Sequence, residues 1–208
     1  MNFTLPKQGQ NALPAKLQSA FYGSEDVVHI SRELLGKVLC ARVNGVLTSA
    51  IITETEAYAG VGDKASHAYG DRRTKRTEPM YQAGGTAYVY LCYGIHHLFN
   101  VVTAGFGTPH AILIRAGQPL EGAALMQKRR RKTAIDQTLL AGPGSLAQAL
   151  GITTRLTGTS LTGDRIWIED RAIEVDPRDV TVGPRVGVDY AAEDAARPYR
   201  FLLARGKR

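Results

Sequence analysis

Two glutamates at the end of an apolar run are the residues best suited to acid–base chemistry. Glu54, Glu56 and Tyr58 occupy alternate positions, so on a strand their side chains would project to the same side. Strand interiors are depleted in Glu. One interpretation is an edge strand with a solvated acidic face. The other is a carboxylate that takes a proton from a water attacking a sugar carbon.

Aromatic residues with a polar tip form a second set: Tyr58, His67, Tyr90 and Tyr93. A nucleobase outside its duplex is held by stacking on aromatic faces and by hydrogen bonds to its edges. The alternative is that these rings belong to the core, with their hydroxyls reaching solvent. Gly94 separates two apolar, β-prone runs, so we expect a hairpin. Tyr93 would then stand at its exposed tip, placed to enter stacked bases.

The overall charge favours a polyanionic partner. The 208 residues include 26 Lys and Arg against 19 Asp and Glu, a net charge of +7. Nucleic acid is the partner that such an excess favours, although many basic proteins are merely soluble. Two basic clusters, Arg72-Arg73-Thr74-Lys75-Arg76 and residues 128–132, are either solvated faces or phosphate contacts. We expect Arg72, Arg73, Lys75 and Arg76 to bind DNA.

Two cysteines, Cys40 and Cys92, lie far apart in the sequence, which favours a reduced intracellular setting over a disulfide framework. No apolar run approaches the ~20 residues of a membrane span. We therefore expect a cytoplasmic, nucleoid-associated monomer with no membrane contact. His96 and His97 would point to opposite faces of a strand, and no third ligand stands at a familiar spacing. We expect no metal and no cofactor.

The chain reads as alternating strands and helices. Asn44-Gly45 predicts a tight turn between strands 38–43 and 46–58. Further strands are expected at 86–100, around Gly94, and at 110–116, 166–169, 180–188 and 199–203. Helices are expected from Ser24 to Gly36, from Pro119 to Lys132, and from Leu146 to Leu150 with Ser145 as cap. This pattern predicts an α+β fold around a largely antiparallel sheet.

Three sequence regions are expected. Residues 1–20 lack a sustained period and would form a mobile arm. Residues 21–204 would form one compact domain, and residues 205–208 a basic tail. Two polar residues interrupt apolar runs of that domain. Arg115 would need an anion, with Glu56 a natural partner, and Asn100 would satisfy its amide on backbone or on a ligand edge.

Taken together, these segments resemble the alkyladenine (3-methyladenine) DNA glycosylase family. The resemblance runs in family order over most of residues 20–204. The matching pieces are Glu33–Lys37, Glu54–Tyr58, Ser66–Ala68, Gly85–Gly94, Asn100–Val101, Ile112–Ala116 with Pro119–Gly122, Gly142–Gly144 and Arg185–Val188.

The resemblance implies a single compact domain on a curved antiparallel sheet, with a protruding hairpin that intercalates into DNA. It also implies hydrolysis of the N-glycosidic bond of alkylated or deaminated purines in duplex DNA, without a catalytic lysine. By position, Glu56 matches the general base. Arg115 and the backbone carbonyl of Val186 match the other groups that hold the nucleophilic water.

The base-binding residues follow from the same resemblance. Tyr58 and His67 match the residues that sandwich the flipped base, with His67 hydrogen-bonding its edge, and Tyr90 matches the residue that closes the opposite side. Asn100 and Leu113 match positions that crowd the purine 2-position, while Tyr93, next to Gly94, matches the intercalating tyrosine. Two alternatives stay open. A non-catalytic module that stacks single-stranded bases leaves the glutamates unexplained, and a glycosidase for free nucleosides or sugars leaves the basic clusters unexplained.

Overall fold

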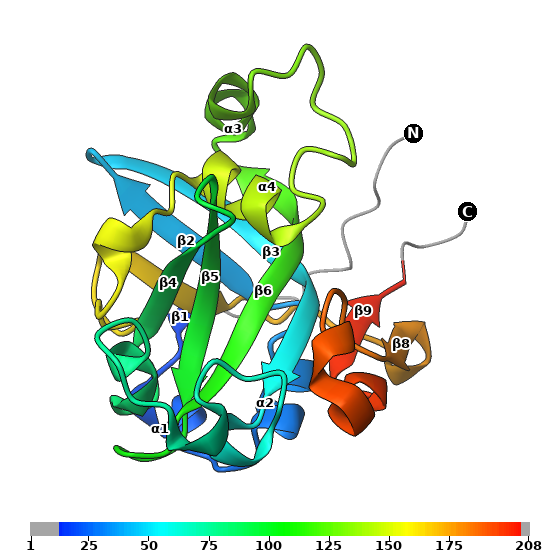
Figure 1. Cartoon of the computed structure of the whole chain (residues 1–208). Helices are drawn as coiled ribbons and strands as arrows, with labels where there is room; N and C mark the ends of the chain where they lie inside the picture. Colours follow the sequence, from blue (N-terminus) through cyan, green and yellow to red (C-terminus); the bar gives the residue numbers. More distant parts are fainter. Residues whose placement is uncertain (1–12, 205–208) are drawn as a thin grey trace.

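A single antiparallel sheet organises the chain (Figure 1). The structure, a computed structural model, describes residues 13–204. The expectations for residues 1–12 and for the tail 205–208 lie outside the described residues. The strands are β1 (Ala15–Lys16), β2 (Val38–Val43), β3 (Val46–Tyr58), β4 (Ala87–Cys92), β5 (His96–Thr103), β6 (His110–Glu121), β7 (Ile166–Asp170), β8 (Val180–Gly183) and β9 (Arg200–Leu203).

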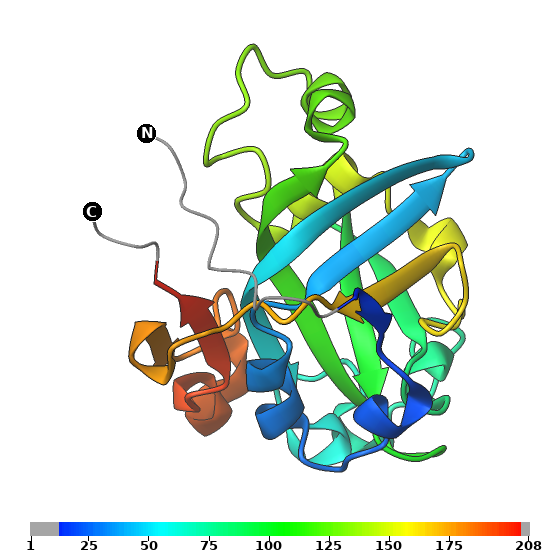
Figure 2. The same cartoon turned by 180° about the vertical axis from the view of Figure 1, so that it is seen from behind.

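The strand order is β1-β7-β2-β3-β6-β5-β4, and β9 pairs with both β3 and β8. The sheet curls, so that β4, β5 and β6 lie in front of β7, β2 and β3 in Figure 1 and behind them in Figure 2. Side chains from both halves, such as Phe99 of β5 and Ile168 of β7, meet in one buried cluster. The predicted α+β class with a curved antiparallel sheet is confirmed.

Helices lie around this sheet rather than within it. They are α1 (Ser19–Tyr22), α2 (Val27–Glu33), α3 (Ala123–Arg130) and α4 (Pro143–Leu150). Short 3-10 turns span Gly60–Gly62, Tyr69–Asp71, Glu78–Tyr81, Thr154–Leu156, Pro177–Asp179 and Asp189–Ala196. α2 and α4 add apolar side chains to the main core, including Val27, Ile30, Leu146 and Leu150. Burying apolar area on this scale is the main favourable term in folding.

The predicted β2–β3 hairpin is confirmed. Val43 pairs with Val46, and the two residues between them have positive φ, 52° for Asn44 and 77° for Gly45. Asn and Gly tolerate that conformation at low cost, and it matches the twist of the flanking strands.

A β-bulge in β3 changes which residues face the core. The register with β6 shifts between Ile52 and Glu54 and again between Glu54 and Thr55. Before the shift Ala50 and Ile52 lie in the main core, and after it Ala57 does so. The even-numbered residues that follow the shift therefore project from the opposite face of the sheet, as bulges permit.

Three helix predictions are wrong in their boundaries. Pro119 does not open a helix, because it lies in β6, which continues to Glu121 and pairs with Ala50 of β3 there. The β5 pairings of β6 involve only residues 110–113, so the missing N–H of Pro119 falls where a second partner strand is not required. The following helix, α3, begins at Ala123.

Ser145 does not cap α4, since the helix starts at Pro143 with Gly142 as N-cap. Proline suits the first helical turn because its absent N–H would be unpaired there anyway. Ser24 is not the cap of α2 either. Asp26 has that role, and its carboxylate accepts the backbone N–H of His29 at 2.9 Å.

The strand expected at 180–188 is shorter than predicted. β8 ends at Gly183, and Pro184, which has no N–H to donate, begins the irregular segment that follows. Of the arm expected at 1–20, Ala15 and Lys16 pair with β7, and α1 begins at Ser19.

Candidate active site

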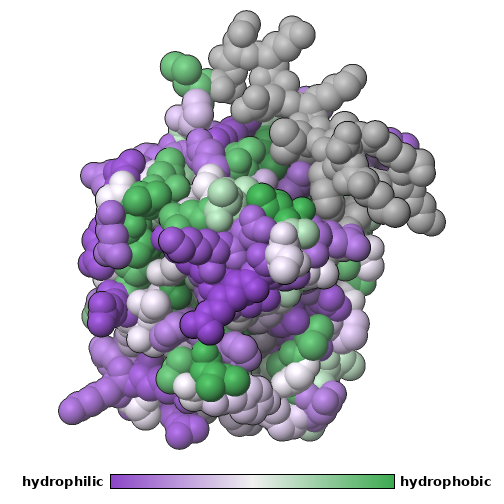
Figure 3. Space-filling view, turned by 90° about the horizontal axis from the view of Figure 1, so that it is seen from above, coloured by the Kyte–Doolittle hydropathy of each residue, from purple (hydrophilic) through white to green (hydrophobic). Residues whose placement is uncertain are grey.

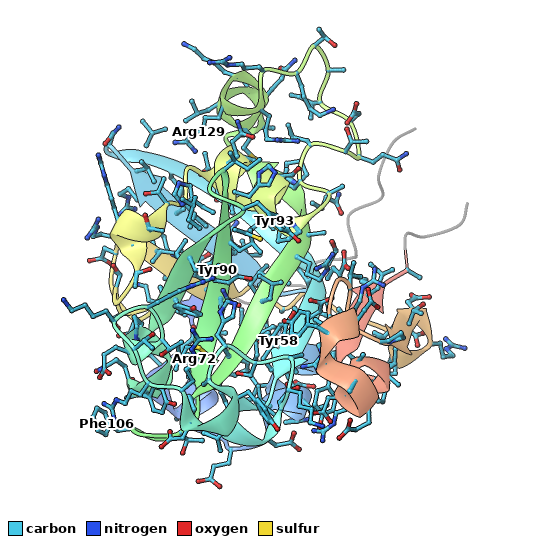
Figure 4. The ribbon with its side chains drawn as sticks, in the orientation of Figure 1. Tyr58, Arg72, Tyr90, Tyr93, Phe106 and Arg129 are labelled. Carbon is cyan, nitrogen blue, oxygen red and sulfur yellow. The ribbon has the colours of Figure 1, made fainter. Side chains whose placement is uncertain are left out.

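A cavity of about 410 Å³ opens on the outer face of β4, β5 and β6. Figure 4 shows Tyr58, Tyr90 and Tyr93 around this face, the first from the end of β3 and the other two from the hairpin of β4 and β5. The cavity is lined by Tyr58, Ala65, His67, Arg76, Met80, Tyr88, Tyr90, Leu91, Cys92, Tyr93, Leu98, Asn100, Ala111, Leu113, Arg115, Val186, Gly187, Val188 and Tyr190. It thus joins side chains of the hairpin, the segment 65–76 and the segment 186–190.

Glu56 is fully buried beside this cavity and accepts three hydrogen bonds. Its Oε2 accepts the hydroxyl of Tyr58 at 2.9 Å and Nη1 of Arg115 at 3.3 Å, and its Oε1 accepts the backbone N–H of Val186 at 2.8 Å. All three partners are donors, and a carboxylate group offers the acceptor oxygens that they need. Side chains alternate between the two faces of a strand, and after the bulge Glu56 therefore lies on the outer face of the sheet.

Arg115 connects both glutamates of β3. Its Nε donates to Glu54 at 2.9 Å and its Nη1 to Glu56. Burial disfavours the guanidinium charge, but Glu56 and Glu54 outweigh that cost and raise the pKa of Arg115. Glu54 is also bonded by Arg200 of β9 at 2.7 Å. Glu54 therefore forms ion pairs with two arginines.

A buried ion pair holds the segment that carries Val186. The guanidinium of Arg185 makes two hydrogen bonds to Asp63 and donates to the carbonyls of Ala57 and Asp194. Its charge also lies 4.9 Å from the ring centroid of Tyr58, a cation–π contact. Neither side chain of the pair is exposed. Charge-assisted, two-pronged pairs of this type fix geometry as well as adding energy.

The aromatic wall of the cavity is formed by rings in edge contact. The centroids of His67 and Tyr90 lie 4.6 Å apart at an interplanar angle of 78°, and Tyr88 contacts both. The Nδ1 of His67 is 2.9 Å from the Tyr88 hydroxyl. Burial, and then the charges of Arg76 and Arg72, lower the pKa of His67 to about 4. This imidazole is therefore neutral at physiological pH.

Tyr58 belongs to a separate group of side chains on the other side of the cavity. It packs with Ala65, Val188 and Ala191. Burial and the adjacent carboxylate of Glu56 hold the pKa of Tyr58 well above its usual value. Its hydroxyl is therefore a stable donor to Glu56.

Asn100 and Leu113 face each other across β5 and β6, where they are paired in register. Both are buried and line the cavity. The side-chain amide of Asn100 donates to the backbone carbonyl of Tyr88 at 3.1 Å. Its orientation is thus fixed by backbone, one of the two arrangements expected from the sequence.

The predicted β4–β5 hairpin is confirmed, with Tyr93 at its tip. Cys92 pairs with His96, and the side chain of Tyr93 is 92% exposed. Tyr93 has a φ of 50° and Gly94 a φ of 73°, so the tyrosine itself adopts the left-handed region, which is uncommon outside glycine. The tip lies beside the start of α4, because a Cβ on Gly144 would meet the His96 ring at 3.0 Å.

The basic residues at 72–76 differ in their side-chain contacts. All of residues 72–76 are exposed, and Figure 4 places Arg72 on the same side of the molecule as the cavity. Arg73 is paired with Glu78 at 2.7 Å and lies over the ring of Tyr81. Arg76 lies 5.2 Å from the ring centroid of Tyr90 and lines the cavity. Two of the four basic side chains, Arg73 and Arg76, therefore already contact aromatic rings of the protein.

The second basic cluster, at 128–132, is partly structural. Arg129 donates to the carbonyl of Ala149 at 3.0 Å, Arg130 to Gln148, and Lys132 to Asp136 and Thr138. Seen from above, hydrophilic side chains gather at this end of the molecule (Figure 3). These bonds attach α3 to the end of α4 and to the loop that follows α3.

Within residues 13–204, no group of three or more His, Cys, Asp or Glu side chains is arranged to hold a metal ion. No helix of that range is long and apolar enough to cross a bilayer.

Sequence reasoning missed three features of this site. Tyr88 was not assigned, although it alternates with Tyr90 on the same strand and so shares its face. The Arg185–Asp63 pair joins residues 122 positions apart, and Tyr190 lies at the cavity rim with its hydroxyl on the carbonyl of Ala65. No local sequence pattern predicts the Arg185–Asp63 pair or the bond from Tyr190 to Ala65. The structure also shows the amide N–H of Val186, not its carbonyl, bonded to Glu56.

The sheet, the buried carboxylate and the adjacent aromatic cavity suit an enzyme that acts on a flat base attached to a sugar. The methylpurine-DNA glycosylase family matches residues 20–207. The chain belongs to that family, and it is accordingly a DNA glycosylase, a hydrolase of N-glycosyl bonds in DNA repair.

Relatives from several bacteria carry the name "Putative 3-methyladenine DNA glycosylase". One from Chlamydia felis is 46% identical over 188 residues, covering 90% of this chain and 95% of the relative. One from Desulfitobacterium hafniense is 43% identical over 195 residues, with the same coverage. One from Bacillus cereus is 46% identical over 185 residues, covering 85% of this chain and 90% of the relative.

Proposed function

We propose that this DNA glycosylase flips alkylated or deaminated purines out of duplex DNA and releases them with a water activated by Glu56. Residues 21–204 would form the catalytic domain, acting as a monomer on nucleoid DNA. Its substrates would be 3-methyladenine, 7-methylguanine, hypoxanthine and ethenoadenine. The release of the base starts base excision repair.

The position of Glu56 carries this proposal. A carboxylate offers about four lone-pair sites, and three donors from the described residues bond to Glu56. One further site on Oε1, next to Val186, can accept a proton from water. The neighbouring cavity supplies aromatic faces for a base, which agrees with chemistry at the bond between base and sugar.

The reaction needs one water and no covalent enzyme intermediate. Glu56 takes a proton from the water while the oxygen of that water bonds to C1′ of the sugar. The bond from C1′ to the base breaks, and its electron pair leaves with the base. The sugar passes through a state resembling an oxocarbenium ion, which the carboxylate also stabilises. General-base assistance contributes about 10²- to 10⁴-fold.

Access to the sugar requires the nucleotide to leave the stack. The exposed ring of Tyr93 would enter the minor groove and fill the space left by the flipped nucleotide. Unstacking costs least for a damaged or mispaired base, which contributes to selectivity. The base would then lie between Tyr58 and the wall formed by His67 and Tyr90, with Asn100 and Leu113 against its 2-position. Arg72, Lys75 and Arg76 would face the DNA backbone.

A cleavage assay with a substitution at Glu56 tests the proposal. A duplex with a single hypoxanthine is incubated with enzyme and then treated with hot alkali, which breaks the strand where the base is missing. Glu56→Gln keeps the size of the side chain and removes the carboxylate that would act as general base. We expect single-turnover excision to fall by at least about 10²-fold, while binding to lesion-containing DNA in a gel-shift assay persists.

Glu54→Gln is the matched control. Glu54 shares Arg115 with Glu56, but it lines a different cavity, together with Thr53, Pro119 and Leu202. The variant should retain most of the excision rate at a temperature where both variants are folded by circular dichroism. Normal excision by Glu56→Gln would refute the assignment of Glu56 as the general base.

A further inference from the structure

The ring of Tyr190 lies in water at the rim of the base cavity, although its hydroxyl is fixed. The side chain is 70% exposed, and its hydroxyl donates to the backbone carbonyl of Ala65 at 3.2 Å. An aromatic ring that is held in place and still exposed is typical of the anchors by which proteins bind their partners. The proposed mechanism gives this ring no role.

The segment that carries Tyr190 is held on both sides of that residue. Val188 and Ala191 are buried in one cluster of side chains, and the backbone N–H of Ala191 donates to the carbonyl of Val188 at 2.8 Å. The carboxylate of Asp194 accepts the backbone N–H of Lys64 at 2.8 Å. The fold therefore sets the position of the ring, which offers a ligand a preformed surface.

Tyr190 also borders a second cavity. This cavity has a volume of about 400 Å³, and each residue that lines it carries a polar side chain. Two of these residues are Arg72 and Arg76, and guanidinium groups suit phosphate oxygens. The second cavity shares His67, Arg76 and Tyr190 with the base cavity. The two cavities are therefore neighbours, and Tyr190 lies at their border.

In a nucleotide the sugar lies between the base and the phosphate. A flipped nucleotide with its base in the aromatic cavity and a phosphate in the polar cavity would place its sugar at the border, beside Tyr190. The reacting carboxylate lies near this border. Burial raises the pKa of Tyr190, and Glu56 is among the groups close enough to raise it further. Val186, whose N–H bonds to Glu56, belongs to the same segment as Tyr190.

We propose that Tyr190 is a sugar-binding residue, whose ring packs against the deoxyribose of the flipped nucleotide and holds C1′ beside Glu56. This inference rests on the proposed function and adds a contact to the part of the substrate that reacts. The C–H groups of deoxyribose can pack on an aromatic face, and covering the ring removes apolar area from water. Because a displacement of about 1 Å at the reacting atoms can cost about 10²-fold in rate, the contact contributes to excision as well as to binding.

Tyr190→Ala tests the proposal with a lesion that has a sugar and no base. The first readout is the dissociation constant, in a gel-shift assay, of a duplex that contains one tetrahydrofuran abasic analogue and of the same duplex without damage. The substitution should weaken binding to the tetrahydrofuran duplex about 5- to 30-fold, the loss typical of truncating an aromatic anchor. Binding to the undamaged duplex should not change. The second readout is single-turnover excision of hypoxanthine, which should fall at least about 5-fold.

Two variants are controls. Tyr190→Phe keeps the ring and should retain most of the affinity for the tetrahydrofuran duplex. Phe106→Ala removes a ring that is also 70% exposed but lines neither cavity, and Figure 4 shows Phe106 at the edge of the molecule, away from Tyr58 and Tyr90. Phe106→Ala should leave both affinities and the excision rate unchanged. All three variants should melt close to wild type, because both rings are exposed.

An unchanged affinity of Tyr190→Ala for the tetrahydrofuran duplex would overturn the proposal. An equal loss with undamaged duplex would also overturn it, because the contact would then be to the DNA backbone alone. The same holds if Tyr190→Phe loses as much affinity as Tyr190→Ala, or if wild type binds the tetrahydrofuran duplex no more tightly than undamaged duplex. Wild-type protein that releases no hypoxanthine would refute the proposed function instead, while the tetrahydrofuran affinities would still decide the sugar contact.

Discussion

The buried ion pair between Asp63 and Arg185 gives the sharpest stability prediction. Asp63 accepts four donors, two on each oxygen. Oδ2 accepts from the backbone N–H of Ala59 and from Arg185, and Oδ1 from the backbone N–H of Ala65 and from Arg185. In Asp63→Asn, either orientation of the amide points its NH₂ group at two donors. Arg185 also loses its counter-charge in a fully buried site.

Breaking one partner of a buried pair costs about 3–5 kcal/mol. For a chain of this size each kcal/mol lowers the melting temperature by about 2–4 °C, so we expect a fall of about 6–20 °C. Thermal unfolding followed by circular dichroism measures it. Asp176→Asn is the control, because its partner Arg178 is 90% exposed and such surface pairs contribute little. It should melt close to wild type.

The contribution of Asp63 to the stability of the fold depends on pH in a defined direction. Burial raises the pKa of Asp63, but the hydrogen bonds from Arg185 and the Ala59 and Ala65 amides outweigh burial, and the pKa is lowered. A lowered folded-state pKa stabilises the fold above the unfolded value, about 3.9, and this contribution is lost as the pH falls through the folded value. The difference in the free energy of unfolding between wild type and Asp63→Asn should be largest at neutral pH and should shrink below about pH 4. A gap below about 1 kcal/mol at neutral pH would refute the reasoning.

Two further predictions concern the hairpin tip and the cysteines. Tyr93→Ser should reduce base flipping, read by 2-aminopurine fluorescence next to a lesion, with melting unchanged because the ring is exposed; unchanged flipping would remove Tyr93 from that role. Burial first, and then Glu169, raise the pKa of Cys40 to about 12, so in native protein a thiol reagent should modify Cys92, which is partly exposed, and reach Cys40 only after unfolding. Rapid reaction of both thiols would show that β2 opens readily.

Local signals predicted the two hairpins well. Asn44-Gly45 and Gly94 mark their turns because few residues tolerate positive φ. The alternation of Glu54, Glu56 and Tyr58 also placed these three on one face, and the structure brings Tyr58 and Glu56 within hydrogen-bond distance.

What the sequence could not predict depends on distant contacts. The bulge at Glu54 arises from pairing with β6, more than 50 residues away. Pro119 suggested a helix start, and tertiary pairing with β3 overrode that preference. The bond from the Val186 amide to Glu56 depends on how the Arg185–Asp63 pair holds a loop.

The bulge in β3 has a consequence for how this site could be altered. It lets one continuous strand supply apolar residues to the interior in its first half and Glu56 and Tyr58 to the outer face in its second half. Deleting the extra residue would turn a carboxylate toward the apolar interior and an alanine toward the cavity. Libraries that seek new substrates should therefore keep the length of β3 constant and vary the loops at 59–79 and 184–190.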